Sequence, residues 1–290
     1  MKDGFIKAAA ATPKISVADC AANSENIIRL IEAAFEKKVS LLVFPELCIT
    51  GYTCGDLFLS SALIANASKA LAEIAGATKG KKLLVFVGIP IKNQGRLYNC
   101  AAAMFDGKVM AVIPKTVLTD CGGYSETRWF DTYSYSKTVE ISLEDFDYKI
   151  PIGTKLLFRS DKYPEICIGA EIGEDLLSPI PPSVYHAAAG AAIIAGLSAS
   201  NEIVGKAERR RLIISNHSER INAGYIFSNA GDGESTTDMV FSCHGLIYEN
   251  GAILAEKKPF SENAELLISE IDTGALAYER RRRKTFDSFP

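Results

Sequence analysis

Two charged side chains, Glu46 and Lys115, each stand at the end of an apolar run, LLVFP before Glu46 and MAVIP before Lys115. The carboxyl ends of buried strands are where α/β folds gather their active sites, so both residues are candidates for chemistry. A carboxylate there can act as a general base, and a lysine ammonium can stabilise an oxyanion. Structural roles compete with this interpretation: a helix cap or a buried ion pair for Glu46, and a surface-reaching side chain for Lys115. Downstream, Glu126 and Arg128 can hold Lys115 in place or pair with each other.

A third segment, CIGAEIGEDLLSPIPPS (167–183), contains an expected strand that ends in a bend at Gly173. A sharp strand-to-turn bend is the usual platform for a nucleophile, but glycine has no side chain to offer. Taken alone, Gly173 is a turn glycine that permits positive φ. Ser198, Ser200 and Asn201 follow another apolar run and are expected at the same mouth, although each serine can instead cap the helix expected from about 204.

Short β-rich runs alternate with longer segments of helical period, which predicts one α/β domain over 1–290. The expected strands are 5–12, 40–44, 82–90, 98–105, 108–115, 153–160, 166–172, 191–199, 224–231, 238–249 and 265–272, and the expected helices are 20–37, 60–79, 181–189 and 204–222. The polar and aromatic segment 131–152 interrupts this pattern, so we expect a surface insertion there. The basic run 280–284 is interpreted as a tail or a surface strap. Strand runs that are apolar throughout imply sheets covered on both faces, which two facing sheets or one doubly wound sheet would satisfy.

The composition argues against several other classes of function. A formal net charge of −3 gives no reason to expect a nucleic-acid partner, and no run of about 18 apolar residues indicates a membrane span. His186, His217 and His244 show no metal-ligand spacing and form no catalytic set with serine or cysteine. Neither GxxxxGKS/T nor GxGxxG occurs, so no metal and no nucleotide cofactor is expected in this domain. Seven cysteines without CxxC spacing favour a reducing compartment, which we take to be the cytoplasm.

Four phrases of the sequence carry a resemblance to a known family: FPELCITGYTCGDLF, the downstream RWF, EIGEDLLSPIPPS and GDGESTTDMVF. In this order they resemble the nitrilase, or carbon–nitrogen hydrolase, superfamily, and within it the glutamine-hydrolysing domain of glutamine-dependent NAD synthetases. The resemblance runs from about residue 5 to about residue 272. It implies a four-layer αββα sandwich, a Glu-Lys-Cys triad that hydrolyses amides, and ammonia supplied for NAD synthesis from deamido-NAD.

The resemblance also implies roles for individual residues. Glu46 matches the general base, Lys115 the oxyanion-stabilising lysine, and Glu126 the additional glutamate that supports the lysine. The residues that match positions around the family's glutamine pocket are Tyr52, Glu174, Ser200 and Lys206, of which Lys206 occupies a site that is arginine in some relatives.

Three departures from the family pattern bear on activity. Gly173 stands where the family has its nucleophilic cysteine, so glutamine hydrolysis is expected to be near nil. Cys121, Gly123 and Ser125 stand where relatives usually carry tyrosine, glutamate and tyrosine, so an aromatic wall of the pocket is expected to differ. Cys121, which flanks the Lys115 loop, is the one other thiol that we consider as a substitute nucleophile. No SGGxDS loop occurs, so we expect the synthetase domain, with its ATP and deamido-NAD sites, to be absent from this chain.

Three functions remain open at this level. The first is a glutaminase domain that has lost its cysteine, which the retention of Glu46, Lys115 and Glu126 favours. The second is a non-catalytic binding or interaction module, and the third is an amidase for another small amide, suggested by the altered loop around Cys121. The resemblance further implies a homo-oligomer, with a synthetase domain in cis if the chain is a truncation.

Overall fold

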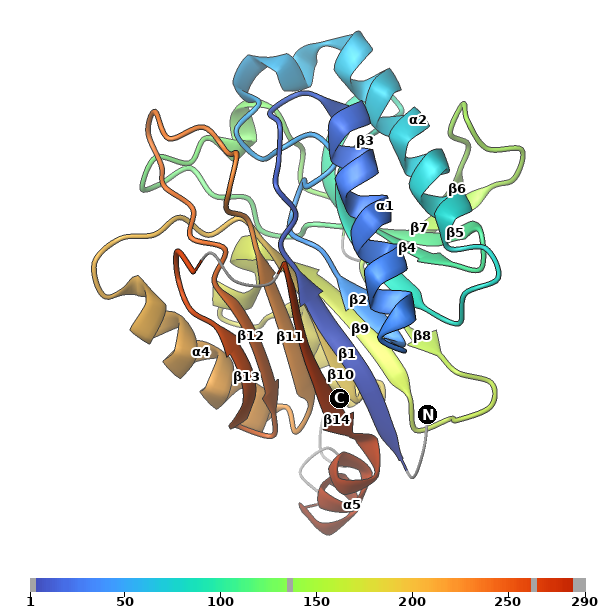
Figure 1. Cartoon of the computed structure of the whole chain (residues 1–290), viewed down its shortest axis with the longest axis vertical. Helices are drawn as coiled ribbons and strands as arrows, with labels where there is room; N and C mark the ends of the chain where they lie inside the picture. Colours follow the sequence, from blue (N-terminus) through green and yellow to red (C-terminus); the bar gives the residue numbers. More distant parts are fainter. Residues whose placement is uncertain (1–3, 135–137, 262–264, 284–290) are drawn as a thin grey trace.

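Two mixed β-sheets packed face to face form the centre of the protein, in a computed structural model that describes residues 4–134, 138–261 and 265–283 (Figure 1). Within these residues, the larger sheet has eight strands, in the order β14 (Leu266–Asp272), β1 (Phe5–Ala11), β2 (Leu41–Val43), β3 (Leu84–Asn93), β4 (Arg96–Phe105), β5 (Lys108–Pro114), β7 (Ile150–Ile152) and β6 (Val139–Ile141). The smaller sheet has six, in the order β13 (Ala252–Lys257), β12 (Gly245–Glu249), β11 (Gly224–Asn229), β10 (Ile193–Ser198), β9 (Cys167–Ile172) and β8 (Phe158–Arg159).

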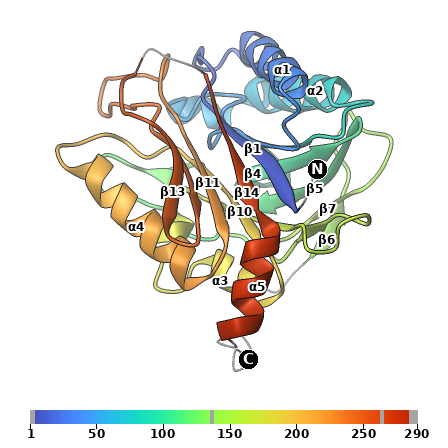
Figure 2. The ribbon, with the colours of Figure 1, turned by 60° about the horizontal axis from the view of Figure 1, so that its bottom comes forward.

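Helices cover the outer face of each sheet and complete four layers. On the eight-stranded sheet, α1 (Cys20–Glu36) and α2 (Ser61–Ala77) lie side by side (Figure 1). The six-stranded sheet is covered by α3 (Pro182–Ala188) and α4 (Lys206–Arg220), and Figure 2 shows these two helices on the opposite side of the molecule from α1 and α2. A further helix, α5 (Thr273–Arg283), projects from the end of β14 (Figure 2). The expected αββα sandwich is therefore confirmed, and a single doubly wound sheet is wrong.

Successive side chains of the central strands enter the two apolar layers on opposite faces of a sheet. In β1, Ala10 belongs to the apolar layer between the sheets, whereas Ala9 packs beneath the layer formed by α1 and α2. In β10, Ile193 faces the other sheet, and Ile194 packs beneath α3 and α4. Both faces of these central strands are thus buried, which is why their runs read as apolar throughout.

Several elements differ from those expected from the sequence. The strand expected at 153–160 is reduced to β8, and the one expected at 238–249 begins only at Gly245. The segment 131–152 contributes β6 and β7, a hairpin that extends the edge of the larger sheet beyond β5, while residues 135–137 lie outside the described residues. β13 and α5 have no counterpart among the expected elements. The basic run 280–284 belongs to α5 as far as Arg283, and Lys284 lies outside the described residues.

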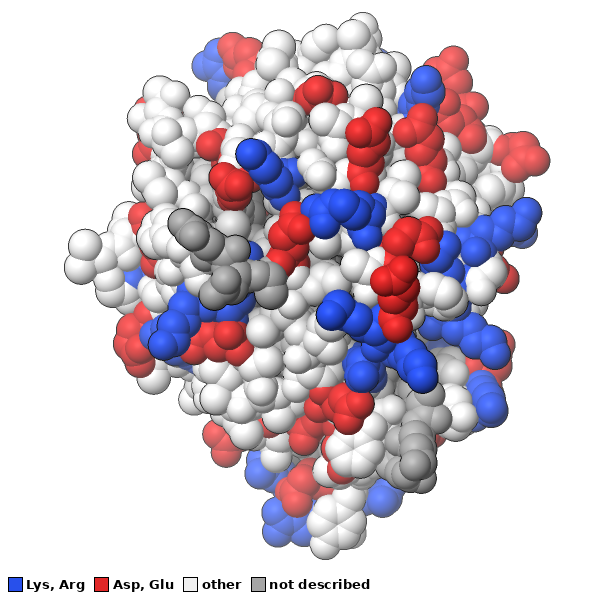
Figure 3. All heavy atoms as spheres, in the orientation of Figure 1, with Lys and Arg blue, Asp and Glu red and all other residues white. Residues whose placement is uncertain are grey.

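The surface shown in Figure 3 mixes the two signs of charge. Lysine and arginine side chains are interspersed with aspartate and glutamate over this face, in keeping with a formal net charge of only −3. Among the helices of the described residues, none combines the length and the apolar character that crossing a membrane would need.

Candidate active site

Four strands, two from each sheet, end beside one pocket of about 590 Å³. Glu46 comes just after β2 and Lys115 directly after β5, so the larger sheet supplies the carboxylate and the ammonium. Gly173 comes directly after β9 and Ser200 just after β10, so the smaller sheet supplies the bend and part of the far wall. The residues that the sequence singled out all line this pocket: Glu46, Tyr52, Lys115, Glu126, Gly173, Glu174, Ser200 and Lys206.

A buried ion cluster at the base of the pocket joins Lys115 to two carboxylates. Lys115 Nζ donates to Glu46 Oε1 at 2.7 Å and to Glu126 Oε1 at 2.6 Å. All three side chains are at most 2 % exposed, so the surface-reaching interpretation of Lys115 is wrong. Glu126 holds the lysine, whereas Arg128 pairs with Asp56 at the surface. Removing Lys115 would leave two buried carboxylates without their cation, which is strongly destabilising.

Both carboxylate oxygens of Glu46 are fixed by further donors. Asn99 Nδ2 donates to Oε1 at 2.7 Å, and the backbone N–H of Ala199 donates to Oε2 at 2.9 Å. Burial raises the pKa of Glu46 to about 7, against the opposing effect of the Lys115 ammonium. Burial acts to lower the pKa of Lys115, but the two carboxylates together raise it above its usual value. A fixed carboxylate that titrates near neutrality is suited to take and return a proton.

Gly88 on β3 sets how deeply the Glu46 loop lies. A Cβ at residue 88 would be 2.0 Å from Leu47 N and 2.5 Å from Pro45 O, so any larger residue would push the loop away. The backbone N–H of Ile49 donates to Gly88 O at 3.2 Å and fastens the loop at this depth. The close approach of the two backbones therefore places Glu46 at the base of the pocket.

A second set of hydrogen bonds supports Glu126 from behind. Tyr52 OH donates to Glu126 Oε1 at 2.7 Å, and the backbone N–H of Thr119 donates to Oε2 at 3.0 Å. The backbone N–H of Tyr52 in turn donates to Glu234 Oε1 at 2.7 Å. Glu234 is a buried residue of the phrase GDGESTTDMVF, and no role was expected for it from the sequence alone. It acts on the ion cluster through the position of Tyr52.

Gly173 begins the 3₁₀ turn η3 (Gly173–Leu177) directly after β9, with a φ of +52°. The expected positive φ is therefore confirmed. A Cβ built on Gly173 would lie 2.5 Å from Glu46 Oε2 and 2.9 Å from Lys115 Nζ. The bend therefore aims residue 173 at both members of the ion pair, which is the geometry of a strand-to-turn nucleophile platform.

Asp175, for which the sequence analysis predicts no role, fastens this bend to the loop after Lys115. Its Oδ1 accepts from the backbone N–H of Thr116 at 2.9 Å and of Val117 at 2.8 Å. Its Oδ2 accepts from the backbone N–H of Ile172 at 3.1 Å. One buried carboxylate thus ties the end of β5 to the end of β9, so that the lysine and residue 173 keep a fixed relation.

Ser200 belongs to the pocket wall and not to the start of α4. The residue before α4 is Gly205, and no side chain caps the helix there, so the capping interpretation of Ser200 is wrong. Ser200 Oγ accepts from Arg210 Nη2 at 3.3 Å. Arg210 is buried, donates to Glu202 Oε2 at 3.1 Å, and contacts His244 Nδ1 at 2.6 Å. A held positive charge therefore lies behind this wall.

Aromatic rings form another wall of the pocket. Tyr52 and Tyr124 meet edge to face with their ring centroids 5.9 Å apart, and Phe227 also lines the pocket. Tyr124 OH accepts from the backbone N–H of Asn201 at 2.7 Å. Lys206 Nζ donates to Asn201 Oδ1 and lies 5.9 Å from the centroid of the Tyr124 ring. Asn201 and the Tyr124 ring therefore hold this ammonium in the wall of the pocket.

Thiols contribute little to this site. Cys121 is exposed and lines the pocket, with its Sγ 3.5 Å from Thr119 Oγ1. Cys167 is buried in the core beneath α3 and α4, as its place in the strand predicted. Burial raises the pKa of both Cys48 and Cys54 to about 12, so neither forms a thiolate near neutral pH.

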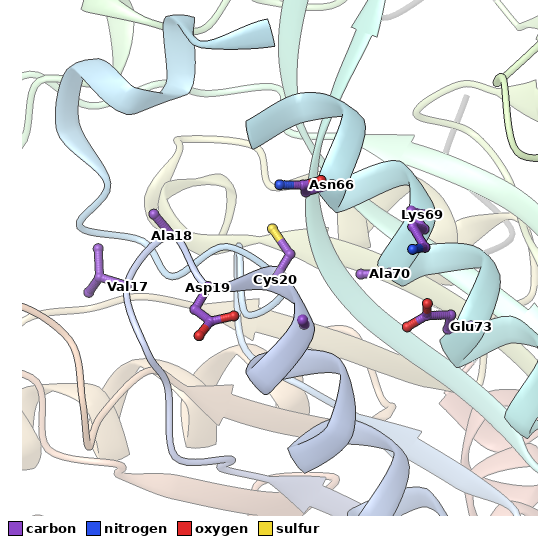
Figure 4. A pocket seen from close by; sticks show the side chains of 9 residues that line it. Val17, Ala18, Asp19, Cys20, Asn66, Lys69, Ala70 and Glu73 are labelled. Atoms are coloured by element: carbon purple, nitrogen blue, oxygen red, sulfur yellow. The ribbon is translucent and has the colours of Figure 1, made fainter. Parts of the chain in front are cut away.

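A second, smaller hollow of about 360 Å³ lies between the start of α1 and the exposed side of α2 (Figure 4). Figure 4 shows Asp19, Cys20, Lys69 and Glu73 around it. Burial raises the pKa of Cys20 to about 11, which keeps this thiol protonated. The hollow contains no member of the ion cluster, so we assign the chemistry to the larger pocket. Within the described residues, no three His, Cys, Asp or Glu side chains gather as a metal ion would require.

Comparison with known proteins supplies the relatives of this chain. Its sequence matches the carbon–nitrogen hydrolase family over residues 7–280. The glutamine-dependent NAD(+) synthetase of Mycobacterium tuberculosis is 35% identical over 285 residues, which make up 98% of this chain and 41% of that protein. The chain thus spans about two fifths of the length of the curated relatives it matches.

Two solved structures resemble the fold. The crystal structure of a glutamine-dependent NAD(+) synthetase from Cytophaga hutchinsonii matches with a TM-score of 0.82 and 30% identity, over 93% of this chain and 43% of that one. A cysteine-to-alanine mutant of the amidase from Nesterenkonia sp. AN1, solved in complex with butyramide, matches with a TM-score of 0.72. That match has 16% identity and covers 97% of both chains, so it supports the fold alone.

Proposed function

The chain belongs to the carbon–nitrogen hydrolase family, and we propose that its pocket is a glutamine site without the thiol that would turn glutamine over. The observation that carries the proposal is the convergence of Glu46 and Lys115 on residue 173. The two groups come from different strands, and further hydrogen bonds hold both in place. A scaffold protein has no physical need to bury a carboxylate and an ammonium at the base of an open pocket, because their desolvation is costly.

The roles of the two groups follow from their chemistry. With a thiol at position 173, Glu46 would take its proton and later return a proton to the leaving ammonia. Lys115 would stabilise the oxyanion formed when the thiolate attacks the amide carbon. Glycine offers no sulfur for that attack, so no thioester forms. We therefore expect the protein to bind glutamine and release almost no ammonia from it.

The far end of the pocket has charges that suit an amino-acid head group. Glu174 can accept hydrogen bonds from an α-ammonium, while Lys206 and the hydroxyl of Ser200 can donate to an α-carboxylate. Arg210 behind Ser200 adds positive potential on the same side. Tyr52 would line the path of the aliphatic chain between this end and the ion cluster. In this arrangement the side-chain amide reaches Lys115 and Glu46.

Calorimetric titration with glutamine tests the proposal directly. We expect saturable binding, weakened at least tenfold by Lys206→Met, because the carboxylate would lose a charged partner. The matched variant Lys206→Arg keeps the charge and should retain most of the affinity. Ammonia release by the unaltered protein should stay at the level of the buffer. Ammonia release at the rate of an ordinary glutaminase, or no glutamine binding, would refute the proposal.

Two other functions are favoured by particular residues. A non-catalytic binding or interaction protein is consistent with Gly173, and it would bind another ligand or none in place of glutamine. An amidase for another small amide is suggested by Cys121 in the pocket lining. A panel of small amides tested with Gly173→Cys separates these cases, because a preference for an amide other than glutamine would favour the amidase. The Nesterenkonia amidase structure shows that an alanine mutant of that protein's cysteine still holds butyramide.

The proposal places this domain within a longer reaction. In the synthetases that it resembles, glutamine-derived ammonia would serve NAD synthesis from deamido-NAD, an ATP-dependent ligase reaction of a second domain that would lie in cis. We propose that residues 1–290 are one nitrilase-like domain in which 131–152 is a surface insertion. A cytoplasmic homo-oligomer is the expected form, and a molar mass measured by light scattering tests the oligomeric part, against 31.3 kDa for one chain.

A further inference from the structure

Arg210 lies behind the pocket wall that contains Ser200, between two sets of hydrogen-bond acceptors. Its Nη2 donates to Ser200 Oγ at 3.3 Å and to the backbone oxygen of Asn201 at 3.4 Å. Its Nη1 donates to Glu202 Oε2 at 3.1 Å and to His244 Nδ1 at 2.6 Å. The guanidinium is a rigid planar fork, so whatever fixes Nη1 also fixes the direction of Nη2. The partners of Nη1 therefore determine how Arg210 meets the pocket wall.

The contact between Arg210 and His244 decides which nitrogen of the imidazole carries the proton. A guanidinium has donors only, so His244 Nδ1 must accept and is unprotonated. The proton then lies on Nε2, which donates to Glu256 Oε1 at 3.0 Å. The same carboxylate oxygen accepts from Arg211 Nε at 2.9 Å. The imidazole is thus a neutral bridge between a carboxylate on β13 and a guanidinium on α4.

The surroundings of His244 keep its imidazole neutral. The side chain is buried, and burial together with the Arg210 guanidinium lowers its pKa. Arg211 acts in the same direction, and Glu256 opposes them. At neutral pH, Nδ1 therefore keeps the lone pair that Arg210 needs. A protonated imidazole would bring two cations into contact, and Arg210 would have to turn away.

The other side of Arg210 orders the donors of the pocket wall. Because Ser200 Oγ accepts from Nη2, its own proton is left to be donated, and Ser200 lines the pocket. Asn201, whose backbone oxygen also accepts from Nη2, accepts from Lys206 Nζ through its side-chain Oδ1. Arg210 thus connects to both groups, Ser200 and Lys206, that can donate to a carboxylate here.

We propose that His244 is a positioning residue for the glutamine pocket. Its unprotonated Nδ1 holds Arg210 in the orientation that presents the two donors of the wall to the carboxylate of the ligand. His244 is not among the residues that line the pocket, so it acts on the ligand through Arg210. The inference rests on the proposed function, because it takes the ligand to be an amino acid whose carboxylate meets this wall.

Two variants of nearly equal shape test the role of Nδ1. Leucine and asparagine have the same branched outline, but only asparagine offers an oxygen to Arg210 close to the place of Nδ1. Calorimetric titration with glutamine at neutral pH compares the unaltered protein, His244→Leu and His244→Asn. We expect His244→Leu to bind glutamine about tenfold more weakly, because Arg210 loses an acceptor and its fork is no longer fixed. His244→Asn should recover most of the affinity.

Nuclear magnetic resonance of the three histidines gives a readout that a loss of stability alone would not move. The signals that vanish in His244→Asn identify His244, and they should show a neutral ring with its proton on Nε2. The guanidinium protons of Arg210 should exchange slowly with solvent in the unaltered protein and in His244→Asn. In His244→Leu their exchange should be faster.

Three results would overturn the inference. The first is an unchanged glutamine affinity in His244→Leu, the second is an equal loss in both variants, and the third is a proton on Nδ1 of His244. Thermal unfolding of each variant guards against misfolding, and the position of the imidazole proton in the unaltered protein keeps the test decisive if His244→Leu does not fold.

A failure of the proposed function is distinguishable from a failure of this inference. If the unaltered protein binds no glutamine, the proposed function is wrong, and the exchange of the Arg210 protons then decides the inference. Faster exchange in His244→Leu than in His244→Asn supports the positioning of Arg210 by His244. Equal exchange in the two variants overturns it.

Discussion

With glycine at position 173, the charged groups of the ion cluster contact one another and no side chain of residue 173. Glu46 and Lys115 are 2.7 Å apart, and a side chain at 173 would press against both. Both contacting atoms end flexible side chains, so they can withdraw from a side chain at this position. Asn99, Ala199 and Glu126 limit how far they can retreat. The residue that occupies this one position therefore decides whether the cluster has a side chain of residue 173 to act on.

Gly173→Cys should introduce glutamine hydrolysis under the proposed function. The thiol would lie against Glu46, its base, so we expect ammonia release to rise by several orders of magnitude, as the loss of a nucleophile costs that much in other triads. The positive φ of +52° should cost the variant roughly 1 kcal/mol of stability. Gly173→Ala carries the same backbone strain without sulfur and is the matched control. Equal ammonia release from the two variants would count against the assigned triad geometry.

Glu171, two positions before Gly173, should make stability fall as pH rises. Its Oε2 accepts from the backbone N–H of Ser183 at 2.9 Å and its Oε1 from Tyr225 OH at 2.8 Å, and burial raises its pKa from 4.5 to about 7. The folded state therefore binds this proton more tightly than the unfolded state. The resulting stability is complete below about pH 4.5 and is lost by about pH 7, up to roughly 3 kcal/mol.

Urea unfolding of the unaltered protein and of Glu171→Gln at pH 5 and pH 8 measures this effect. The amide keeps the shape of the side chain and has no proton to lose, so the difference between the two pH values should shrink. Tyr225 OH can turn to accept from the new amide group. An unchanged pH dependence in Glu171→Gln would show that other groups dominate.

At the residue scale, the sequence could predict the charged residues that follow strands but not their supports. Glu46 and Lys115 were identifiable because each ends an apolar run. Asn99, Asp175 and Glu234 support the site from 53, 59 and 182 positions away from their partners, and no local pattern connects them. Their roles depend on which strands become neighbours, and only the fold decides that.

At the scale of elements, periodicity predicted most helices and strands to within a few residues. The helix expected at 20–37 is α1, and its Asp19 cap accepts from the backbone N–H of Ala22. Strand β8 was overestimated because an apolar run does not reveal how much of it finds a partner strand. Helix α5 was missed because four consecutive arginines suggest a solvated tail, whereas Arg280 is directed into the protein.

Arg280 should stabilise the junction of α3, α4 and α5. Its guanidinium donates to the carbonyl oxygens of Asn222 at 3.0 Å, Ala191 at 2.5 Å and Ile221 at 3.3 Å, all in the segments that follow α3 and α4. Arg280→Met would leave these acceptors without a buried donor, and we expect it to lose about 2 kcal/mol of unfolding free energy. Chemical denaturation measures this loss.

Arg280→Lys is the matched control for the charge. An ammonium cannot reproduce the planar fork of the guanidinium, so we expect it to recover only part of the loss. Glutamine affinity should be unchanged in both variants, because Arg280 does not line the pocket. A drop in affinity without a drop in stability would contradict a purely structural role.

At the scale of the whole molecule, the site exists because two sheets end at one place. The larger sheet contributes Glu46 and Lys115, and the smaller sheet contributes Gly173 and Ser200. Asp175 and the backbone N–H of Ala199 bridge the two halves. Shifting one sheet over the other would separate the residues of the site, so the packing of the two sheets and the geometry of the pocket are maintained together.

This coupling predicts that glutamine stabilises the whole fold. A ligand that binds only the folded state at 100 times its dissociation constant adds about 2.7 kcal/mol to the unfolding free energy. For a domain of this size that amounts to a rise of several degrees in the unfolding temperature, which differential scanning fluorimetry can measure. The unfolding temperature of Lys206→Met should rise far less at the same glutamine concentration, and that of Lys206→Arg nearly as much as that of the unaltered protein.

Asparagine, shorter by one methylene, should raise the unfolding temperature less than glutamine does, because its amide cannot reach Glu46 and Lys115 while its head group is held at Lys206. Equal shifts with glutamine and asparagine would mean that the ion cluster takes no part in binding.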